Sequence, residues 1–182
     1  MTWISVGEHE RTGRGFEHPA FFMRYDIEIS GIEAAPQGSK IRTRYGMREA
    51  SKRVGPWRDA VRTEALAACG ELIEEACSVT VEFRFLRPKG DFGAKGNLRP
   101  SARRHYTTKR NDIDKCCRSL MDGLTGSAIA DDCWVVKLCA SQRYCEPGER
   151  PGASVTIQTV AQSPIQTQQT GVMIGSVQST TP

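Results

Sequence analysis

Alternating apolar and polar residues predict the first two strands of this chain. Residues 22–30 alternate so that a methionine, a tyrosine and two isoleucines fall on one face. Residues 77–85 alternate in the same way, with cysteine, valine or phenylalanine at every second position. A period of two is typical of strands that bury one face against a core. The pattern therefore predicts two strands, each with one buried face.

A helical period replaces this alternation in two places. Apolar residues recur three and four positions apart after Pro56, which predicts a helix of roughly 16 to 20 residues with Gly70 near its end. A second helix is predicted from Ile113 to Gly123 or Gly126, because its apolar residues share one face. Those residues are Ile113, Cys116, Cys117, Leu120 and Leu124.

The last predicted elements are two strands joined by a turn. Residues 133–144 and 153–160 have strand composition, and the Pro- and Gly-rich segment 146–152 between them has turn composition. We predict that these two strands form a hairpin. Together the elements indicate an α/β (α+β) fold in which a small mixed sheet packs with two main helices.

These elements occupy the middle of the chain. A length of 182 residues suits one domain with a core of its own. Residues 1–20 are polar and interrupted by glycine, and 161–182 are rich in Gln, Ser, Thr and Gly. We therefore predict a mobile lead-in over 1–20, a folded domain over 21–160, and a C-terminal tail without fixed structure over 161–182.

Cysteine usage and hydropathy indicate a reduced, cytoplasmic protein. The seven cysteines are odd in number and contain no Cys-x-x-Cys pair, so we interpret them as small core residues rather than as disulfides. The chain shows neither a signal peptide nor a stretch long enough to span a membrane. No membrane partner and no small-molecule cofactor are expected.

Positive charge is concentrated in two predicted loops. Fourteen of the 25 basic residues lie in 40–53 and 87–110, which together hold only two of the 21 acidic residues. The first loop is expected to contain no long element, and the second, 88–106, to order on a partner. Clustered Lys and Arg suit a polyanion, although solvated basic loops are the alternative. Eight residues are predicted to contact DNA: Lys89, Lys95, Arg99, Arg103, Arg104, Lys109, Arg110 and Lys115.

Five carboxylates gather between residues 111 and 137. Asp112 and Asp114 stand at the start of the second helix, and Asp132 stands before the next strand. Carboxylates are the ligands that Mg²⁺ prefers, and phosphodiester hydrolysis uses such a cation, so these three residues are candidate ligands. Arg118, one turn past Asp114, could reach the scissile phosphate.

The alternative interpretation of these acids is structural. Asp at a helix start is a common cap, Asp-Asp before a strand is ordinary turn chemistry, and Arg118 could pair with Asp114 and Asp122 on a solvated face. Spacing alone leaves both interpretations open. No phosphate-binding Gly motif, Ser-His-Asp order or Cys-His zinc spacing offers a competing site.

A family resemblance bears on this choice. The segments DIDKCCRSLMDGLTG from residue 112 and ADDCWVV from residue 130 resemble the RusA family of Holliday-junction resolvases, and APQGSK and EASKRVGPWR resemble its members in phages of actinobacteria. The resemblance covers about residues 22–160. It implies a homodimer that makes paired cuts in a four-way DNA junction, in the bacterial host cytoplasm if the chain is phage-encoded. It also implies metal ligation by Asp112, Asp114 and Asp132, with Mg²⁺ as cofactor and Mn²⁺ as a substitute.

Two positions depart from the family pattern. Lys115 stands where the pattern has Asn, and Arg118 stands where it has Lys, which keeps the charge but changes its geometry. Lys115 could contact phosphate or weaken metal binding. The departures keep two alternatives open: a branched-DNA-binding protein with weakened or lost cleavage, and a metal-dependent nuclease for another branched substrate.

Overall fold

The described structure covers the predicted domain. The computed structural model describes residues 23–38, 40–49, 51–107 and 110–160. The predicted lead-in and C-terminal tail lie outside these residues, as does Lys109.

Four strands form one mixed sheet. They are β1 (Arg24–Ser30), β4 (Cys77–Phe85), β5 (Val135–Tyr144) and β6 (Gly152–Thr159), in the order β1-β6-β4-β5. Strand β4 is parallel to β5 and antiparallel to β6, and β1 is antiparallel to β6. The predicted mixed sheet is therefore confirmed, and β1 and β4 bury the faces that the alternation indicated.

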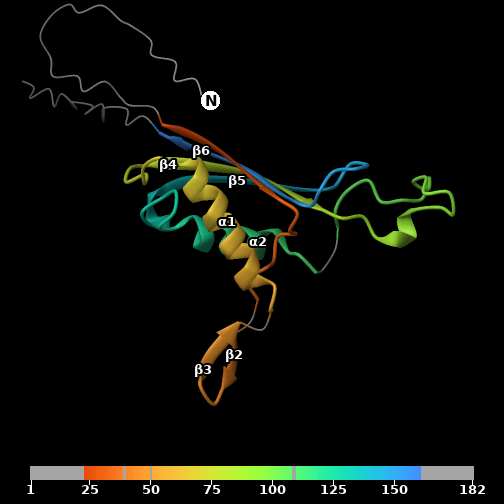
Figure 1. Cartoon of the computed structure of the whole chain (residues 1–182), viewed down its shortest axis with the longest axis horizontal. Helices are drawn as coiled ribbons and strands as arrows, with labels where there is room; N and C mark the ends of the chain where they lie inside the picture. The colour runs from red at the N-terminus through yellow and green to blue at the C-terminus, as the bar shows by residue number, and fades with distance from the viewer. Residues whose placement is uncertain (1–22, 39, 50, 108–109, 161–182) are drawn as a thin grey trace, which may run out of the picture.

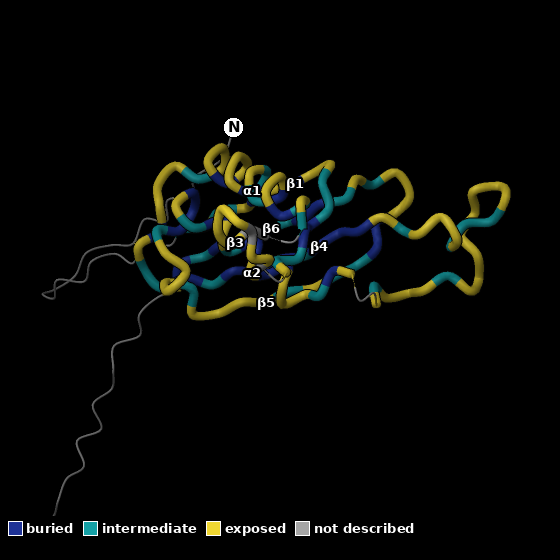
Figure 2. Tube along the Cα trace, turned by 90° about the horizontal axis from the view of Figure 1, so that it is seen from below, coloured by how far each residue is buried: buried dark blue, intermediate teal, exposed yellow. Residues whose placement is uncertain are grey.

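The predicted hairpin between the last two strands is wrong. Strand β4 lies between β5 and β6, so these two strands do not pair with each other. Seven residues connect them, enough to cross two strand spacings of about 5 Å each. Burial explains the order: β4 is mostly buried and suits the centre, whereas β5 is largely exposed and suits an edge (Figure 2).

Two helices cover one face of this sheet. Helix α1 (Val54–Ala68) and helix α2 (Ile113–Leu124) lie side by side on it (Figure 1). Helix α1 begins two residues before Pro56 and ends at Ala68. Gly70 was predicted to lie near the end of the helix, but it lies outside it. Helix α2 ends next to Gly123 as predicted, and its apolar face is buried except at Ile113.

The helices pack closely on each other and on β4. Trp57 is fully buried, and its ring lies 6.4 Å from that of Phe83 between centroids. A Cβ atom at Gly123 would lie 2.8 Å from the side chain of Val61, closer than ordinary van der Waals contact. The crossing of α1 and α2 therefore depends on a glycine at position 123.

The opposite face of the sheet is polar and held by ion pairs. The buried guanidinium of Arg84 pairs with Glu28 on β1. Arg143 on β5 pairs with Glu82 at 2.8 Å and with Glu149 at 2.6 Å, between side-chain nitrogen and oxygen. Charges on this face are balanced between acids and bases, so it does not form a basic surface.

Glu149 makes folding sensitive to acid. Hydrogen bonds from Arg143 and from the Glu146 backbone N–H lower its pKa to about 2. A lowered folded-state pKa adds stability above about pH 4.5, and this contribution is lost as pH falls toward 2. In urea unfolding, Glu149→Gln is expected to be less stable than the unmodified chain at pH 7, with the difference shrinking at pH 2.5. A difference that does not depend on pH would contradict this account; exposed Glu64→Gln is the control.

Two segments extend from the compact body. One is an antiparallel hairpin of β2 (Lys40–Thr43) and β3 (Gly46–Glu49), within the first predicted basic loop, 40–53. The other, residues 86–110, contains the short helix η1 (Lys89–Asp91) and several turns. Figure 1 shows them projecting in different directions. The sequence did not predict the hairpin.

The cysteines fit the interpretation as core residues only in part. All seven are free thiols; four are buried and Cys69 is half-buried, but Cys133 and Cys139 are exposed, against the prediction. Burial raises the pKa of the Cys116 thiol to about 12. Among the described residues, no helix is long and apolar enough to cross a membrane.

Candidate active site

The start of α2 is fixed by hydrogen bonds to neighbouring elements. Asn111 is buried, and its side-chain amide donates to the Tyr106 hydroxyl at 2.7 Å. The Gln142 side chain on β5 donates to the Asn111 carbonyl at 2.9 Å, and the Gln37 N–H donates to the Lys115 carbonyl at 3.0 Å. Three separate segments thus hold the position of the predicted acids Asp112 and Asp114.

Asp112 does not act as a helix cap. It occupies the N-cap position of α2, yet its side chain makes no capping hydrogen bond. Its carboxylate instead accepts from the Lys115 ammonium, with 2.6 Å between Oδ2 and Nζ. This contact raises the pKa of Lys115. Both side chains line a cavity of about 380 Å³ that also receives Arg53 and Arg110, so Asp112 lies among positive charges.

Asp114 and Asp132 open into a different space. A groove of about 520 Å³ runs between α2 and the edge strand β5. Its polar lining is Asp114, Arg118, Asp122 and Asp132, and its apolar floor is Ile113, Cys117, Met121, Leu138 and Ala140. The structure therefore brings together two of the three predicted ligands and the predicted Arg118, and it places Asp112 in the neighbouring cavity.

The two acids of the Asp-Asp pair have different roles. Asp131 accepts a hydrogen bond from the Cys133 backbone N–H at 2.9 Å, which lowers the pKa of Asp131 and caps the short helix η2 (Asp132–Trp134). Asp131 thus fits the turn chemistry of the alternative interpretation. Asp132 is exposed and lines the groove. Strand β5 begins at Val135, two residues later than predicted, because η2 precedes it.

Asp122 is neutralised by a residue that the sequence did not single out. The Arg58 guanidinium on α1 pairs with the Asp122 carboxylate on α2. The predicted alternative, in which Arg118 pairs with Asp114 and Asp122, is not what the structure shows. Arg58 could have been predicted as the partner of Asp122 only if it had been known which face of α1 packs against α2.

The positive charge of Arg118 is available to bind a phosphate. Among the described residues, neither Arg118 nor Asp114 forms an ion pair. Arg118 is exposed and faces the same groove as Asp114 and Asp132. The groove thus combines two carboxylates that could hold a cation with one guanidinium that could hold a phosphate.

Two of the three predicted ligands, Asp114 and Asp132, provide carboxylates that suit a hard cation. Within the described ranges, no three His, Cys, Asp or Glu side chains form a group that could hold a metal ion. Mg²⁺ is commonly bound by one or two carboxylates, with water and substrate phosphate completing its six oxygen ligands. Asp114 and Asp132 meet that requirement, because they share a groove that is open to solvent and substrate. Asp112 does not join them while Lys115 holds it.

The predicted DNA contacts are on the surface. Exposed basic side chains in the 86–110 extension are Lys89, Lys95, Arg99, Arg103, Arg104 and Arg110. Lys115 is exposed as well, but its ammonium is paired with Asp112. Arg87, in the same basic stretch, has a structural role: it lies 4.6 Å from the Tyr144 ring and donates to the Arg103 carbonyl at 2.9 Å.

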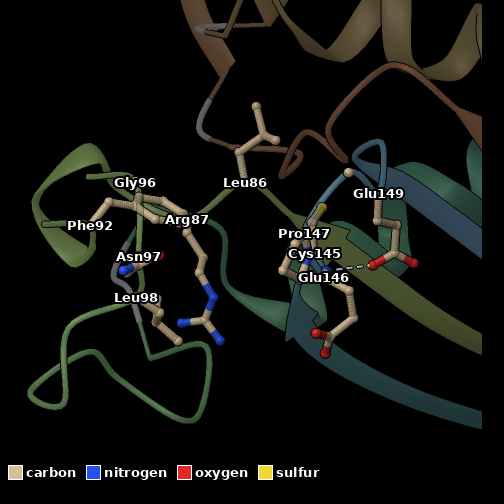
Figure 3. A pocket seen from close by; sticks show the side chains of 11 residues that line it. Leu86, Arg87, Phe92, Gly96, Asn97, Leu98, Cys145, Glu146, Pro147 and Glu149 are labelled. Atoms are coloured by element: carbon tan, nitrogen blue, oxygen red, sulfur yellow. Dashed lines mark hydrogen bonds between the residues drawn. The ribbon is translucent and has the colours of Figure 1, made fainter. Parts of the chain in front are cut away.

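A further cavity lies at the far end of β5. It measures about 580 Å³ and separates the 86–98 segment from the turn that follows β5 (Figure 3). Leu86, Phe92 and Leu98 line one side, and residues 145–149 line the other. The acidic side chains that line it are Glu146 and Glu149, and Glu149 pairs with Arg143. This cavity therefore differs from the groove beside α2, which is lined by two carboxylates, Asp114 and Asp132, that form no ion pair among the described residues.

Comparison with protein-family models matches most of the chain to one family. The family model for endodeoxyribonuclease RusA matches residues 34–158, most of the chain. The chain belongs to the RusA endodeoxyribonuclease family. The resemblance seen in the sequence is thus confirmed, while a phage origin stays a prediction. No curated protein matches the chain.

Family membership sets the reaction class. RusA proteins are endodeoxyribonucleases, so the chain belongs among enzymes that cut DNA internally. The matched residues include the whole groove between α2 and β5, and also the cavity around Asp112.

Proposed function

We propose that this RusA protein is a Mg²⁺-dependent nuclease that resolves four-way DNA junctions by paired, symmetric cuts. The observation that carries the proposal is the groove in which, within the described structure, Asp114 and Asp132 face Arg118 without a neutralising base. Incubation of the protein with a synthetic four-way junction and Mg²⁺ tests it. Symmetric nicks in two opposing strands are expected, and an intact junction would contradict the proposal.

Each groove residue has a separate task. Asp114 and Asp132 would hold the cation, which when bound neutralises the scissile phosphate and lowers the pKa of the attacking water. Arg118 would bind a phosphate oxygen through its guanidinium and so orient the DNA strand. Arg58 keeps Asp122 paired, so that this third acid of the groove neither competes for the cation nor repels phosphate.

Asp112 would bind the cation only after its ion pair with Lys115 is broken. The Lys115 ammonium occupies one oxygen of its carboxylate, so a cation can share Asp112 only when Lys115 moves. A DNA phosphate gives Lys115 an alternative anion, because the pair is exposed and lies beside Arg53 and Arg110. Lys115 thereby links DNA binding to release of Asp112.

The two basic extensions would hold DNA on either side of the groove. The 86–110 extension carries six exposed predicted contacts, and the β2–β3 hairpin carries exposed Arg42 and Arg44. Such side chains bind phosphates with little regard to base sequence. The polar outer face of the sheet offers a weaker surface, because Arg84 and Arg143 on it are paired with acids.

A homodimer would form along β5. This strand is the last of the sheet, and in the described structure it pairs only with β4, so its outer backbone groups are available. Val136 exposes an apolar side chain along it, 64% accessible and outside the groove. A second copy would cover this apolar edge and place two grooves in one particle, as paired cuts require.

Val136→Asp is expected to convert the dimer into a monomer, because Val136 is exposed on β5 and does not line the groove. A carboxylate buried in an apolar interface without a partner would be strongly unfavourable. Sedimentation velocity measures the mass of each protein. Leu72→Asp is the matched control, because Leu72 is 42% exposed and lies in the connection between α1 and β4 rather than on β5. A dimer that persists in Val136→Asp would place the interface elsewhere.

A second function is favoured by the Lys115–Asp112 pair. If Lys115 keeps Asp112 from the cation, the protein would bind branched DNA with weakened or absent cleavage. Junction binding without cuts in either Mg²⁺ or Mn²⁺ would select this function. Recovery of cutting in Lys115→Asn would assign the loss to Lys115.

A further inference from the structure

The β2–β3 hairpin is an arm separated from the main sheet. Its strands pair only with each other in the described structure, with Arg42 opposite Met47. Figure 1 shows it projecting beyond the two helices, away from the sheet. A two-stranded hairpin gains little stability by itself. Its projecting position therefore points to a role in contact with a partner.

The arm exposes large apolar side chains near its tip. Exposed fractions are 85% for Tyr45, 62% for Met47 and 42% for Ile41. The Arg44 guanidinium lies 4.7 Å from the Tyr45 ring centroid, so cation and ring form one stacked unit. Apolar side chains gathered on an exposed surface mark a binding site more often than isolated ones do.

Charge identifies the kind of partner. Residues 40–49 include four basic residues and one acidic residue. A partner must therefore be anionic and also offer flat apolar surface. DNA meets both conditions where bases leave the stack, since the phosphates are negative and each base has an aromatic face. A continuous duplex covers those faces, whereas a branch point exposes the terminal base pairs of its arms.

The base of the arm borders the cavity of Asp112, which neighbours the groove that holds Asp114 and Asp132. Pro36 and Gly38 on the segment entering the arm, and Ser51 on the segment leaving it, line the same cavity as Asp112. Each strand of four residues spans about 13 Å. That length equals about four base-pair steps of about 3.4 Å. DNA bound at the groove and the neighbouring Asp112 cavity, a few nucleotides from a branch, would therefore place the branch within reach of the tip.

We infer that the Arg44–Tyr45 tip packs against the exposed base pairs at the branch point and so selects branched DNA over duplex DNA. The inference rests on the proposed function. Arg44 contributes to phosphate attraction and holds the ring, and Tyr45 supplies the stacking surface. Met47 extends the apolar surface below the tip, whereas Ile41, paired with Arg48, lies on the other face of the hairpin.

The test compares Tyr45→Ala with Tyr45→Trp in metal-free buffer with EDTA, where no cutting occurs. Fluorescence anisotropy gives dissociation constants for a four-way junction and for a duplex of equal length. Loss of one stacking contact is expected to weaken junction binding about 5- to 100-fold. Duplex affinity should change less than about twofold, because phosphate contacts remain. Tyr45→Trp should retain the preference for the junction.

A fluorescent base gives a second readout. With 2-aminopurine placed at the branch point, the protein should change its emission, and Tyr45→Ala should lose this change. Leu66→Ala, an exposed apolar truncation on α1, is the matched control and should behave as the unmodified protein.

The outcomes separate this inference from the proposed function. If the unmodified protein binds junction and duplex equally well, the proposed function itself fails. The unmodified protein could prefer the junction while Tyr45→Ala keeps both that preference and the 2-aminopurine signal. In that case the tip does not recognise the branch point, and only the inference is overturned. Equal loss of duplex and junction affinity would also overturn it, because the tip would then be a general DNA contact.

Discussion

Asp114→Asn is expected to reduce junction cleavage at least about 100-fold while changing junction affinity less than about threefold. The substitution keeps the shape of the side chain but removes one anionic oxygen donor from the groove. Among the described residues, only two carboxylates line that groove without a neutralising base, so the loss removes half of the cation's protein ligands. DNA affinity is expected to depend instead on the basic extensions. Single-turnover cleavage of a labelled junction and anisotropy in EDTA measure the two quantities.

The Asp-Asp pair provides a matched comparison for this prediction. Asp132→Asn should lose cleavage as Asp114→Asn does, because its side chain faces the groove. Asp131→Asn should retain most activity, since the amide oxygen of the substituted side chain can still accept from the Cys133 N–H. Equal activity of Asp114→Asn and the unmodified protein would show that the groove is not the site of cleavage. A large loss in Asp131→Asn alone would reverse the assignment of the pair.

Trp57→Ala is expected to lower the free energy of unfolding by about 3–5 kcal/mol. Trp57 is fully buried where α1 meets β4, and truncation would leave a cavity beside Phe83. Helix α1 also positions Arg58, which pairs with Asp122 on α2. The loss should therefore weaken the packing of α1 against α2, the helix that borders the groove. Urea unfolding followed by circular dichroism measures the change.

Two controls define the cause of that loss. Trp57→Phe should cost much less, because an aromatic ring remains and the Trp57 indole N–H has no hydrogen-bond partner among the described residues. Leu66→Ala, on the exposed side of α1, should change stability by less than about 0.5 kcal/mol. A loss under about 1 kcal/mol in Trp57→Ala would show that α1 is not anchored through this residue.

Local periodicity was sufficient to predict most elements of the fold. Strand β4 covers the predicted residues 77–85, and α2 ends at Leu124, next to one of the two glycines that the pattern indicated. Alternation and helical spacing report burial directly, because each face of an element meets either the core or water. The order of strands is a different property. Only the relative burial of β4 and β5 shows why β6 pairs with β4 and not with its sequence neighbour β5.

The hairpin β2–β3 shows a second limit of local patterns. Its strands have four residues each, too short for alternation to be distinguished from chance. Gly46 at a φ of +116° marks the turn, and a Tyr-Gly pair between basic residues was the available signal. The clustering of charge in 40–53 predicted a polyanion-binding segment but could not predict that it projects as an arm.

The candidate site was predicted in its residues but not in its arrangement. Asp114, Asp132 and Arg118 do share one groove, whereas Asp112 faces a basic cavity. Sequence spacing places Asp112 and Asp114 two residues apart, but it does not show which way each side chain turns at a helix start. The ion pair with Lys115 decides that for Asp112, and the pair of Arg58 with Asp122 removes a competing acid.

Paired cutting is the central claim, and a supercoiled plasmid that extrudes one cruciform tests it most directly. Two coordinated cuts within one binding event convert such a plasmid straight to the linear form, whereas independent cuts first produce nicked circles. With Mg²⁺ and excess enzyme, we predict that linear plasmid forms without accumulation of nicked circles, and that Asp114→Asn forms neither. Accumulation of nicked circles as the main product, or no cutting by the unmodified protein, would contradict the account.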